Sequence, residues 1–103
     1  MKYLVTAKAV RPTAAPAMTT TLAQAAKEYI NASVANGKMD CVYLFSTGDG
    51  TGFGIVNADS HERVAEIIME HPAASLYEWE VQPLTDFNKG VDKLIELLRK
   101  QSQ

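Results

Sequence analysis

The chain has 103 residues, of which 47% are hydrophobic and 21% charged, as expected for one globular domain. A net charge of −2 argues against nucleic acid or an anionic membrane as partner, because both require a concentrated basic surface. The single cysteine, Cys41, excludes an internal disulfide, and no apolar run approaches the roughly 20 residues that span a bilayer. No stretch resembles a signal peptide, so we expect a cytoplasmic protein.

The first part of the chain predicts a strand followed by a helix. The strand runs from Lys2 to about Val10 and ends at Arg11-Pro12, because proline cannot donate to a sheet. The uncharged loop Thr13–Met18 is interpreted as a connector, or alternatively as the lip of a pocket. A capping box over Thr21–Gln24 predicts the helix start, and Asn36-Gly37 predicts its end. One helix face carries Leu22, Ala25, Ala26, Tyr29, Ile30 and Ser33.

The next segment predicts a β-hairpin with strands Met39–Ser46 and Thr51–Asn57. Its turn, 47–50, begins a run of alternating glycines that could be taken for a phosphate loop. That interpretation fails because the run does not match GxGxxG and leads into a strand rather than a helix. Gly52 and Gly54 fall on one face of the second strand, where missing side chains admit a close helix or leave room for a ligand.

A second helix follows, with Asp59 as predicted N-cap, Glu62 in its first turn and Pro72 after its end. His61 and His71 lie ten residues apart, roughly 15 Å along a helix, which excludes a shared metal site. His61 is interpreted as a partly exposed surface residue. His71, at the helix end and directed toward the sheet edge, is the better candidate for a functional histidine, the alternative being a hydrogen-bonded structural one.

The last predicted strand, Ser75–Pro83, has two different faces. Its apolar row is Tyr77, Trp79 and Val81, and its polar row is Glu78, Glu80 and Gln82. If the apolar row packs under the helices, the carboxylates face the bare side of the sheet. On an open sheet they are simply solvated, whereas inside a dimeric barrel they would be partly desolvated and one could transfer a proton near neutral pH.

The element order β-α-β-β-α-β predicts an α+β fold of ferredoxin-like type, with a four-stranded antiparallel sheet and two helices on one face. Residues 1–84 form this domain, and residues 85–103 form an added helix beginning near Thr85-Asp86. The apolar stripe of the added helix consists of Phe87, Val91, Leu94, Ile95 and Leu98. Because a monomer of this size leaves one sheet face bare, we expect a homodimer, with the added helix across the partner or over the open end of the barrel. Binding of the helix to another protein is the alternative.

These features resemble the muconolactone isomerase-like family of the dimeric α+β barrel superfamily. The resemblance rests on Gly37-Lys38, the glycine hairpin, 53–57, 60–68 and 80–84, and covers nearly all of residues 2–84. It implies a dimer with a pocket between sheet and helices or within the barrel. Similar proteins include lactone isomerases, cofactor-free monooxygenases, polyketide cyclases and haem-degrading enzymes. The segment Thr13–Ala26 has no ionisable side chain, unlike that of the lactone isomerases, so no acid or base comes from there.

The sequence is compatible with three functions. The first is a small cofactor-independent enzyme of isomerase or cyclase type, which moves a proton on a hydrophobic oxygenated metabolite such as a lactone, polyketide or aromatic intermediate. The others are a non-catalytic dimeric binding protein and a cofactor-free or haem-linked monooxygenase. The candidate catalytic residues are His71, Glu78 and Tyr43. The predicted pocket-lining residues are Tyr3, Thr6, Gly52, Gly54, Trp79 and Glu80. The sequence contains no metal-ligand cluster, and no bound cofactor is predicted.

Overall fold

A computed structural model describes residues 1–10, 19–46, 48 and 50–102. Its elements are β1 (Lys2–Ala9), α1 (Thr20–Ala35), β2 (Met39–Leu44), β3 (Gly52–Asn57), α2 (His61–Glu70), a 3-10 turn (Ala74–Leu76), β4 (Tyr77–Leu84) and α3 (Phe87–Gln101). The predicted βαββαβ order with an added helix is therefore confirmed. The predicted loop Thr13–Met18 and two residues of the hairpin turn, Thr47 and Asp49, lie outside the described residues.

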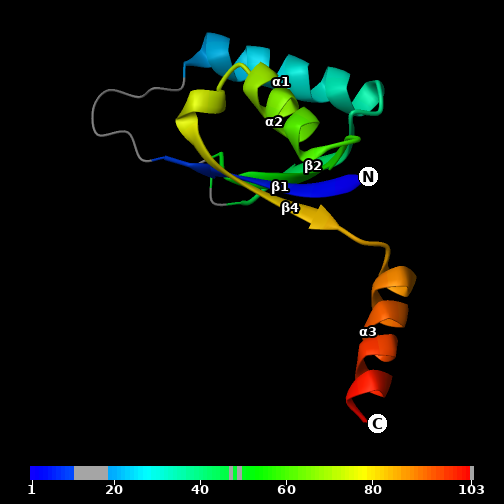
Figure 1. Ribbon diagram of the computed structural model, residues 1–103. Coiled ribbons are helices and arrows are strands. Elements are labelled where there is room, and N and C mark those ends of the chain that lie inside the picture. The colour runs from blue at the N-terminus through cyan, green and yellow to red at the C-terminus, as the bar shows by residue number, and fades with distance from the viewer. Residues whose placement is uncertain (11–18, 47, 49, 103) are drawn as a thin grey trace.

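The four strands form one antiparallel sheet in the order β2-β3-β1-β4. Both α1 and α2 lie over the same face of this sheet, as Figure 1 shows, whereas α3 extends away beyond the end of β4. The fold is thus α+β with one covered and one uncovered sheet face, as the sequence predicts.

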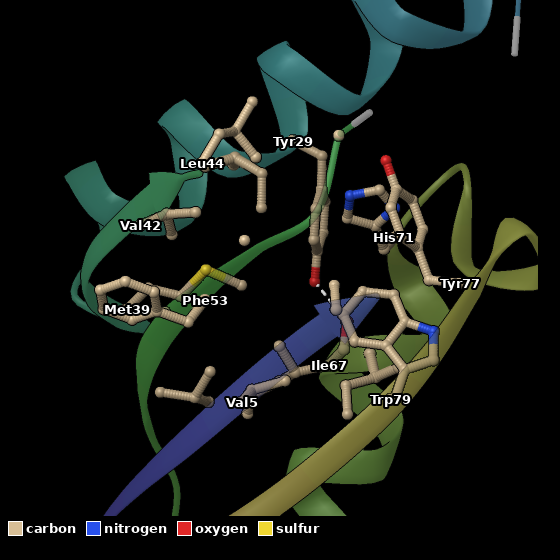
Figure 2. A pocket seen from close by; sticks show the side chains of 17 residues that line it. Val5, Tyr29, Met39, Val42, Leu44, Phe53, Ile67, His71, Tyr77 and Trp79 are labelled. Atoms are coloured by element: carbon tan, nitrogen blue, oxygen red, sulfur yellow. Dashed lines mark hydrogen bonds between the residues drawn. The ribbon is translucent and has the colours of Figure 1, made fainter. Parts of the chain in front are cut away.

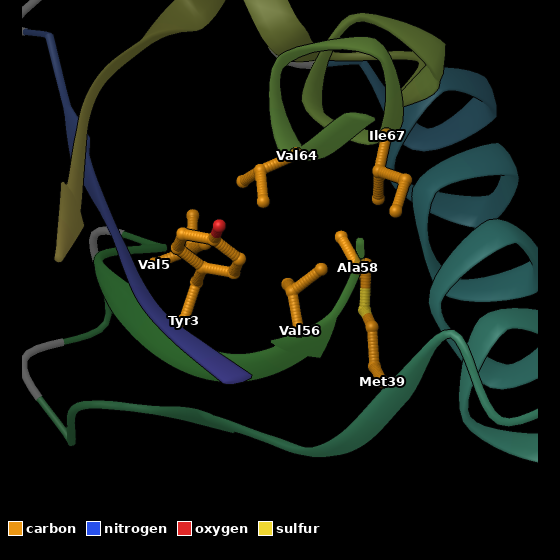
Figure 3. Close-up of a cluster of buried hydrophobic side chains, with 7 residues drawn as sticks. All are labelled: Tyr3, Val5, Met39, Val56, Ala58, Val64 and Ile67. Atoms are coloured by element: carbon orange, nitrogen blue, oxygen red, sulfur yellow. The ribbon is translucent and has the colours of Figure 1, made fainter. Parts of the chain in front are cut away.

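The hydrophobic core lies between the sheet and α2, with α1 closing one side (Figure 3). Val64 and Ile67, one helical turn apart on α2, have exposed fractions of 0% and 1%. They lie over Tyr3 and Val5 of β1 and Val56 of β3. Val64 and Ile67 are three residues apart on the helix, and Tyr3 and Val5 are two residues apart on the strand. These spacings place each pair on one face of its element, and that face is buried.

The helix starts differ from the predicted ones by one or two residues. Thr19, not Thr21, caps α1, because its hydroxyl accepts a hydrogen bond from the backbone N–H of Leu22 at 3.1 Å. Likewise Ser60, not Asp59, caps α2 and accepts from the N–H of Arg63 at 3.2 Å. In both cases neighbouring residues are chemically able to cap, and the sequence alone does not rank them.

The helix ends and the start of the last strand follow from backbone geometry. Gly37 has φ of 86°, the left-handed conformation predicted for the end of α1. The predicted strand start at Ser75 is wrong, because Ser75 lies in the 3-10 turn that separates α2 from β4. Backbone hydrogen bonds from Ala74 N to His71 O at 3.1 Å and from Leu76 N to Ala73 O at 3.0 Å hold this turn.

The helix α3 begins where the sequence predicts, since the carboxylate of Asp86 accepts from the N–H of Lys89 at 3.4 Å. None of its residues is buried, and Phe87 is 79% exposed. Its other exposed large apolar residues are Leu94, Ile95, Leu97 and Leu98. Because α3 stands apart from the sheet (Figure 1), none of the described residues of its own protomer covers its stripe. The division at residue 84 into a domain and an extension stays a prediction.

Candidate active site

An apolar cavity of about 100 Å³ lies on the helix-covered side of the sheet (Figure 2). Val42 and Leu44 of β2 and Ile67 of α2 supply part of its wall, and Tyr29 of α1 stands at its side. Its polar side chains gather at one end, where α2 terminates over β4. There His71, Tyr77 and Trp79 meet. The cavity therefore combines an apolar body with a few convergent polar groups, which is typical of small-molecule sites.

Gly52 and Gly54, two predicted pocket residues, lie in the cavity wall on β3. A Cβ at Gly52 would stand 2.3 Å from the carbonyl oxygen of Tyr43, and one at Gly54 would stand 3.0 Å from that of Cys41. Both oxygens belong to the backbone of β2. These glycines are therefore needed for the close approach of the neighbouring strand, whereas the sequence suggested a close helix or room for a ligand.

His71 occupies the polar end of the cavity as the C-cap of α2. Its Nδ1 accepts a hydrogen bond from the backbone N–H of Ala73 at 3.0 Å. Its ring lies edge-on to three aromatic rings, with centroid distances of 5.8 Å to Tyr29, 6.1 Å to Tyr77 and 5.7 Å to Trp79. Burial in this aromatic surrounding lowers the pKa of His71 below the ordinary 6.5.

Two other polar groups of the cavity wall are already bonded to the backbone. The hydroxyl of Tyr29 donates to the carbonyl oxygen of Ile67 at 2.7 Å, and Nε1 of Trp79 donates to that of Ala74 at 2.9 Å. Burial is the main cause that raises the pKa of the Tyr29 hydroxyl, so this group stays protonated near neutral pH. These bonds fix both aromatic side chains against the backbone that carries His71.

The other predicted site residues lie away from this cavity. Tyr3 belongs to the core, edge-on to His61 at a centroid distance of 6.0 Å. Thr6, Tyr43, Glu78 and Glu80 lie on the uncovered sheet face, where Thr6 pairs with Glu80 across β1 and β4. Tyr43 and the two glutamates are exposed, and the Tyr43 ring lies 5.9 Å from that of Phe53.

The sheet consequently separates the two principal proton-transfer candidates. His71 lies on the covered face and Glu78 on the uncovered one, so within one protomer they do not share a site. The predicted pocket residues Tyr3, Thr6 and Glu80 do not line the cavity, whereas Trp79 does. Alternation along β4 places Trp79 and Glu80 on opposite faces, a consequence of the period of two that the sequence already shows.

Sequence reasoning placed Tyr29 in the core-facing stripe of α1 and gave it no site role. Its hydroxyl reaches α2, and its ring faces His71, so it forms part of the site. The signal was present, because a tyrosine in an otherwise small and aliphatic stripe brings a hydroxyl into the interior that must find a partner. Its partner, a carbonyl on another helix, could be identified only from the fold.

No metal-binding group is found in the described part of the chain. Among those residues, no cluster of three or more His, Cys, Asp or Glu is arranged to hold an ion, and no helix is long and apolar enough to cross a membrane. Cys41 is a free thiol, partly exposed on β2.

An antiparallel sheet with two helices on one face and an apolar cavity between the layers defines a ferredoxin-like α+β protein. Within that class, the chain belongs to the muconolactone delta-isomerase family, whose family model matches residues 1–89. The match ends in the first turn of α3, so most of that helix lies beyond it.

Several solved structures share this fold, among them the two that follow. A crystal structure of muconolactone isomerase superposes with a TM-score of 0.69 at 20% sequence identity, covering 84% of this chain and 90% of that one. A 5-chloro-2-hydroxyhydroquinone dehydrochlorinase from Burkholderia phenoliruptrix AC1100, in complex with 2,5-dihydroxybenzoquinone, superposes with a TM-score of 0.57 at 22% identity. It covers 86% of this chain and 98% of that one. No curated protein sequence matches the chain.

Proposed function

We propose that the protein is a small cofactor-independent enzyme that acts on a hydrophobic, oxygenated ring metabolite from the breakdown of aromatic compounds. The observation that carries the proposal is the apolar cavity with His71 at its polar end. Family membership supports it, as do the names of the two structural neighbours, an isomerase of a lactone and a dehydrochlorinase of a substituted hydroquinone. The reaction class is an isomerisation or elimination that moves a proton next to a carbonyl.

The cavity is preferred over the uncovered face as the site of chemistry because residues of a single chain line it. On the uncovered face, Glu78, Glu80 and Tyr43 are exposed to water and would need a second sheet to enclose them. A reaction that needs an apolar surrounding is thus favoured beside His71. Glu78 and Tyr43 remain candidates for a site that exists only within a dimeric barrel.

The test compares His71→Asn with Glu78→Gln, which remove titration while keeping size and polarity. Muconolactone and 5-chloro-2-hydroxyhydroquinone are supplied, and product formation is followed by chromatography. We expect His71→Asn to lower turnover by roughly a hundredfold and Glu78→Gln to leave it intact, with both variants folded by circular dichroism. The reverse result would indicate that the reaction takes place on the uncovered face. Full activity in both variants would assign it to other residues, and absence of turnover on any ring metabolite would favour the non-catalytic binding protein.

We also propose that two copies pair through the uncovered sheet face to form a dimeric α+β barrel. The half of that face built by β2 and β3 exposes aromatic rings, with Tyr43 61% and Phe45 47% accessible, and both rings lie 5.9 Å from Phe53. Such a cluster on a small domain is typical of an interface. A second copy would cover it, and could also cover the stripe of α3. We expect the dimer in the cytoplasm, where Cys41 stays reduced.

A further inference from the structure

One backbone carbonyl at the end of α2 lacks its usual partner. In a regular α-helix, the carbonyl oxygen of Ile67 would accept from the N–H of His71, four residues later. Here that N–H donates to the carbonyl oxygen of Ile68 at 3.0 Å. Pro72 disfavours a helical conformation at His71, which is extended with φ of −64° and ψ of 128°. The carbonyl of Ile67 therefore belongs to the group at a helix C-terminus that must find donors outside the helix.

Tyr29 of α1 supplies that donor. Its hydroxyl donates to the carbonyl oxygen of Ile67 at 2.7 Å. Ile67 is 1% exposed, so water has little access to this carbonyl and a protein donor is needed to satisfy it. The helix caps at Thr19, Ser60 and Asp86 bond to backbone three residues away, whereas this bond joins two helices. The end of α2 is thus fixed by α1.

The same tyrosine also contacts the side chain of His71. The two rings lie edge-on, with centroids 5.8 Å apart. In Figure 2 the imidazole stands between Tyr29 on one side and Tyr77 on the other, at the end of the cavity. Tyr29 therefore fixes the backbone that leads into His71 through its hydroxyl, and one side of the imidazole through its ring.

We propose that Tyr29 is a positioning residue of the candidate site, whose hydroxyl ends α2 in the conformation that keeps the imidazole of His71 in the cavity. This hydroxyl acts through the backbone of Ile67 and not on a substrate. The proton is moved by His71, and the inference rests on the proposed function for that use of the histidine. The placement of the imidazole can be measured without any substrate.

Tyr29→Phe tests the hydroxyl, because it keeps the ring beside His71 and removes only the donor. Tyr3→Phe is the matched control. Tyr3 lies edge-on to the other histidine, His61, with centroids 6.0 Å apart, and its hydroxyl donates to the sulfur of Met1 at 3.4 Å, away from the end of α2. Both variants are made in the full chain, and the ring signals of the two histidines are followed by NMR as the pH is changed.

The pKa of His71 is the first readout. Burial lowers it below 6.5 in the native protein. Among the described residues, the rings of Tyr29, Tyr77 and Trp79 face it, and the cavity wall includes no Lys, Arg, Asp or Glu. A ring released from its place gains contact with water, so we expect its pKa to rise toward 6.5 in Tyr29→Phe and to stay at its native value in Tyr3→Phe. An unchanged pKa in Tyr29→Phe, or an equal rise in both variants, would overturn the proposal.

Catalysis is the second readout, once a substrate is turned over. Tyr29→Phe should lower kcat about tenfold and leave KM within about twofold, because the cavity wall keeps its shape while the histidine loses its alignment. Tyr3→Phe should change neither constant. An unchanged kcat in Tyr29→Phe, where His71→Asn loses activity, would overturn the proposal.

A measurement on the native chain covers the case in which Tyr29→Phe does not fold. Exchange of the Tyr29 hydroxyl proton with water is followed by NMR. Protection from exchange supports the bond to the carbonyl of Ile67, whereas free exchange overturns the proposal. If the pKa of His71 rises in Tyr29→Phe and no ring metabolite is turned over, or His71→Asn keeps full activity, the positioning is supported and only the proposed function fails.

Discussion

The two faces of the sheet use the same strands for different purposes. On the covered face, β1 and β3 contribute Tyr3, Val5 and Val56 to a core closed by α2. On the uncovered face, the same strands present Thr6 and Phe53 beside the exposed ring of Tyr43. The covered face thus provides the stability and the cavity of one protomer, whereas the uncovered face leaves aromatic rings exposed, which the proposed second copy would cover. Substitutions on the covered face should therefore lower stability, and substitutions on the uncovered face should prevent the proposed pairing.

The largest effect is expected on the covered face, at Ile67. This side chain is 1% exposed between α2 and the sheet, so Ile67→Ala removes buried apolar volume and leaves a void. We expect the free energy of unfolding to fall by about 2–5 kcal/mol, measured by urea denaturation. Met69→Ala on the same helix, at a site 79% exposed, is the matched control and should change stability by less than about 0.5 kcal/mol. Equal losses in both variants would contradict the assignment of the core.

The next effect concerns the uncovered face. Tyr43→Lys places a charge in the exposed aromatic cluster and should prevent pairing of two sheets, because the ammonium group would be desolvated there. Sedimentation at micromolar concentration should show dimers for the native chain and monomers for the variant. Asn31→Lys on the exposed side of α1 adds the same charge away from this face and should remain dimeric. A monomeric native protein would refute the proposed dimer.

A smaller effect is expected from removing residues 85–103. Since α3 makes no buried contact within its own protomer, any stability that it adds must come from a second molecule. If its stripe packs on the partner, truncation after Leu84 should lower the melting temperature by several degrees, and the loss should depend on protein concentration. An unchanged melting temperature and oligomeric state would instead identify α3 as a free element for binding another protein.

The fold could be predicted from the sequence because local patterns determine it. Three local patterns point to the same fold: the period-two alternation in β4, the small-residue stripe of α1 and the glycines of the hairpin. Each pattern predicts the secondary structure of its own segment, and together they predict one βαββαβ fold. The helix starts were less certain, since Thr19 and Thr21 are both capable caps. Only the backbone geometry shows which hydroxyl receives the free N–H.

The site was predicted only in part, for a physical reason. Residues His71 and Trp79 could be placed at the end of a helix and on the apolar face of a strand, and both line the cavity. The role of Tyr29 depends on a contact between two helices, made with Ile67, 38 residues further along the sequence, and no local pattern encodes it. The position of Glu78 relative to His71 depends on which side of the sheet the helices cover. That choice decides whether two candidate groups can meet at all.

The smallest predicted effect is on the pH dependence of stability, through His71. Its pKa in the folded protein lies below 6.5 because of burial, and among the described residues the rings of Tyr29, Tyr77 and Trp79 face it. The adjacent carboxylate of Glu70 is engaged on the surface with Lys38 at 3.5 Å and Arg63 at 3.4 Å.

The unfolded state therefore binds a proton at His71 more readily than the folded state does. The contribution of the neutral ring to stability is fully present above pH 6.5 and is lost as the pH falls through the lowered pKa, when protonation also breaks the bond from Ala73 N–H to Nδ1. We expect the melting temperature to decline below about pH 6.5 and the decline to be shallower in His71→Phe. His61→Asn, at the exposed start of α2, is the matched control and should leave the slope in place. A native slope unchanged by removing His71 would show that its burial does not couple protonation to folding.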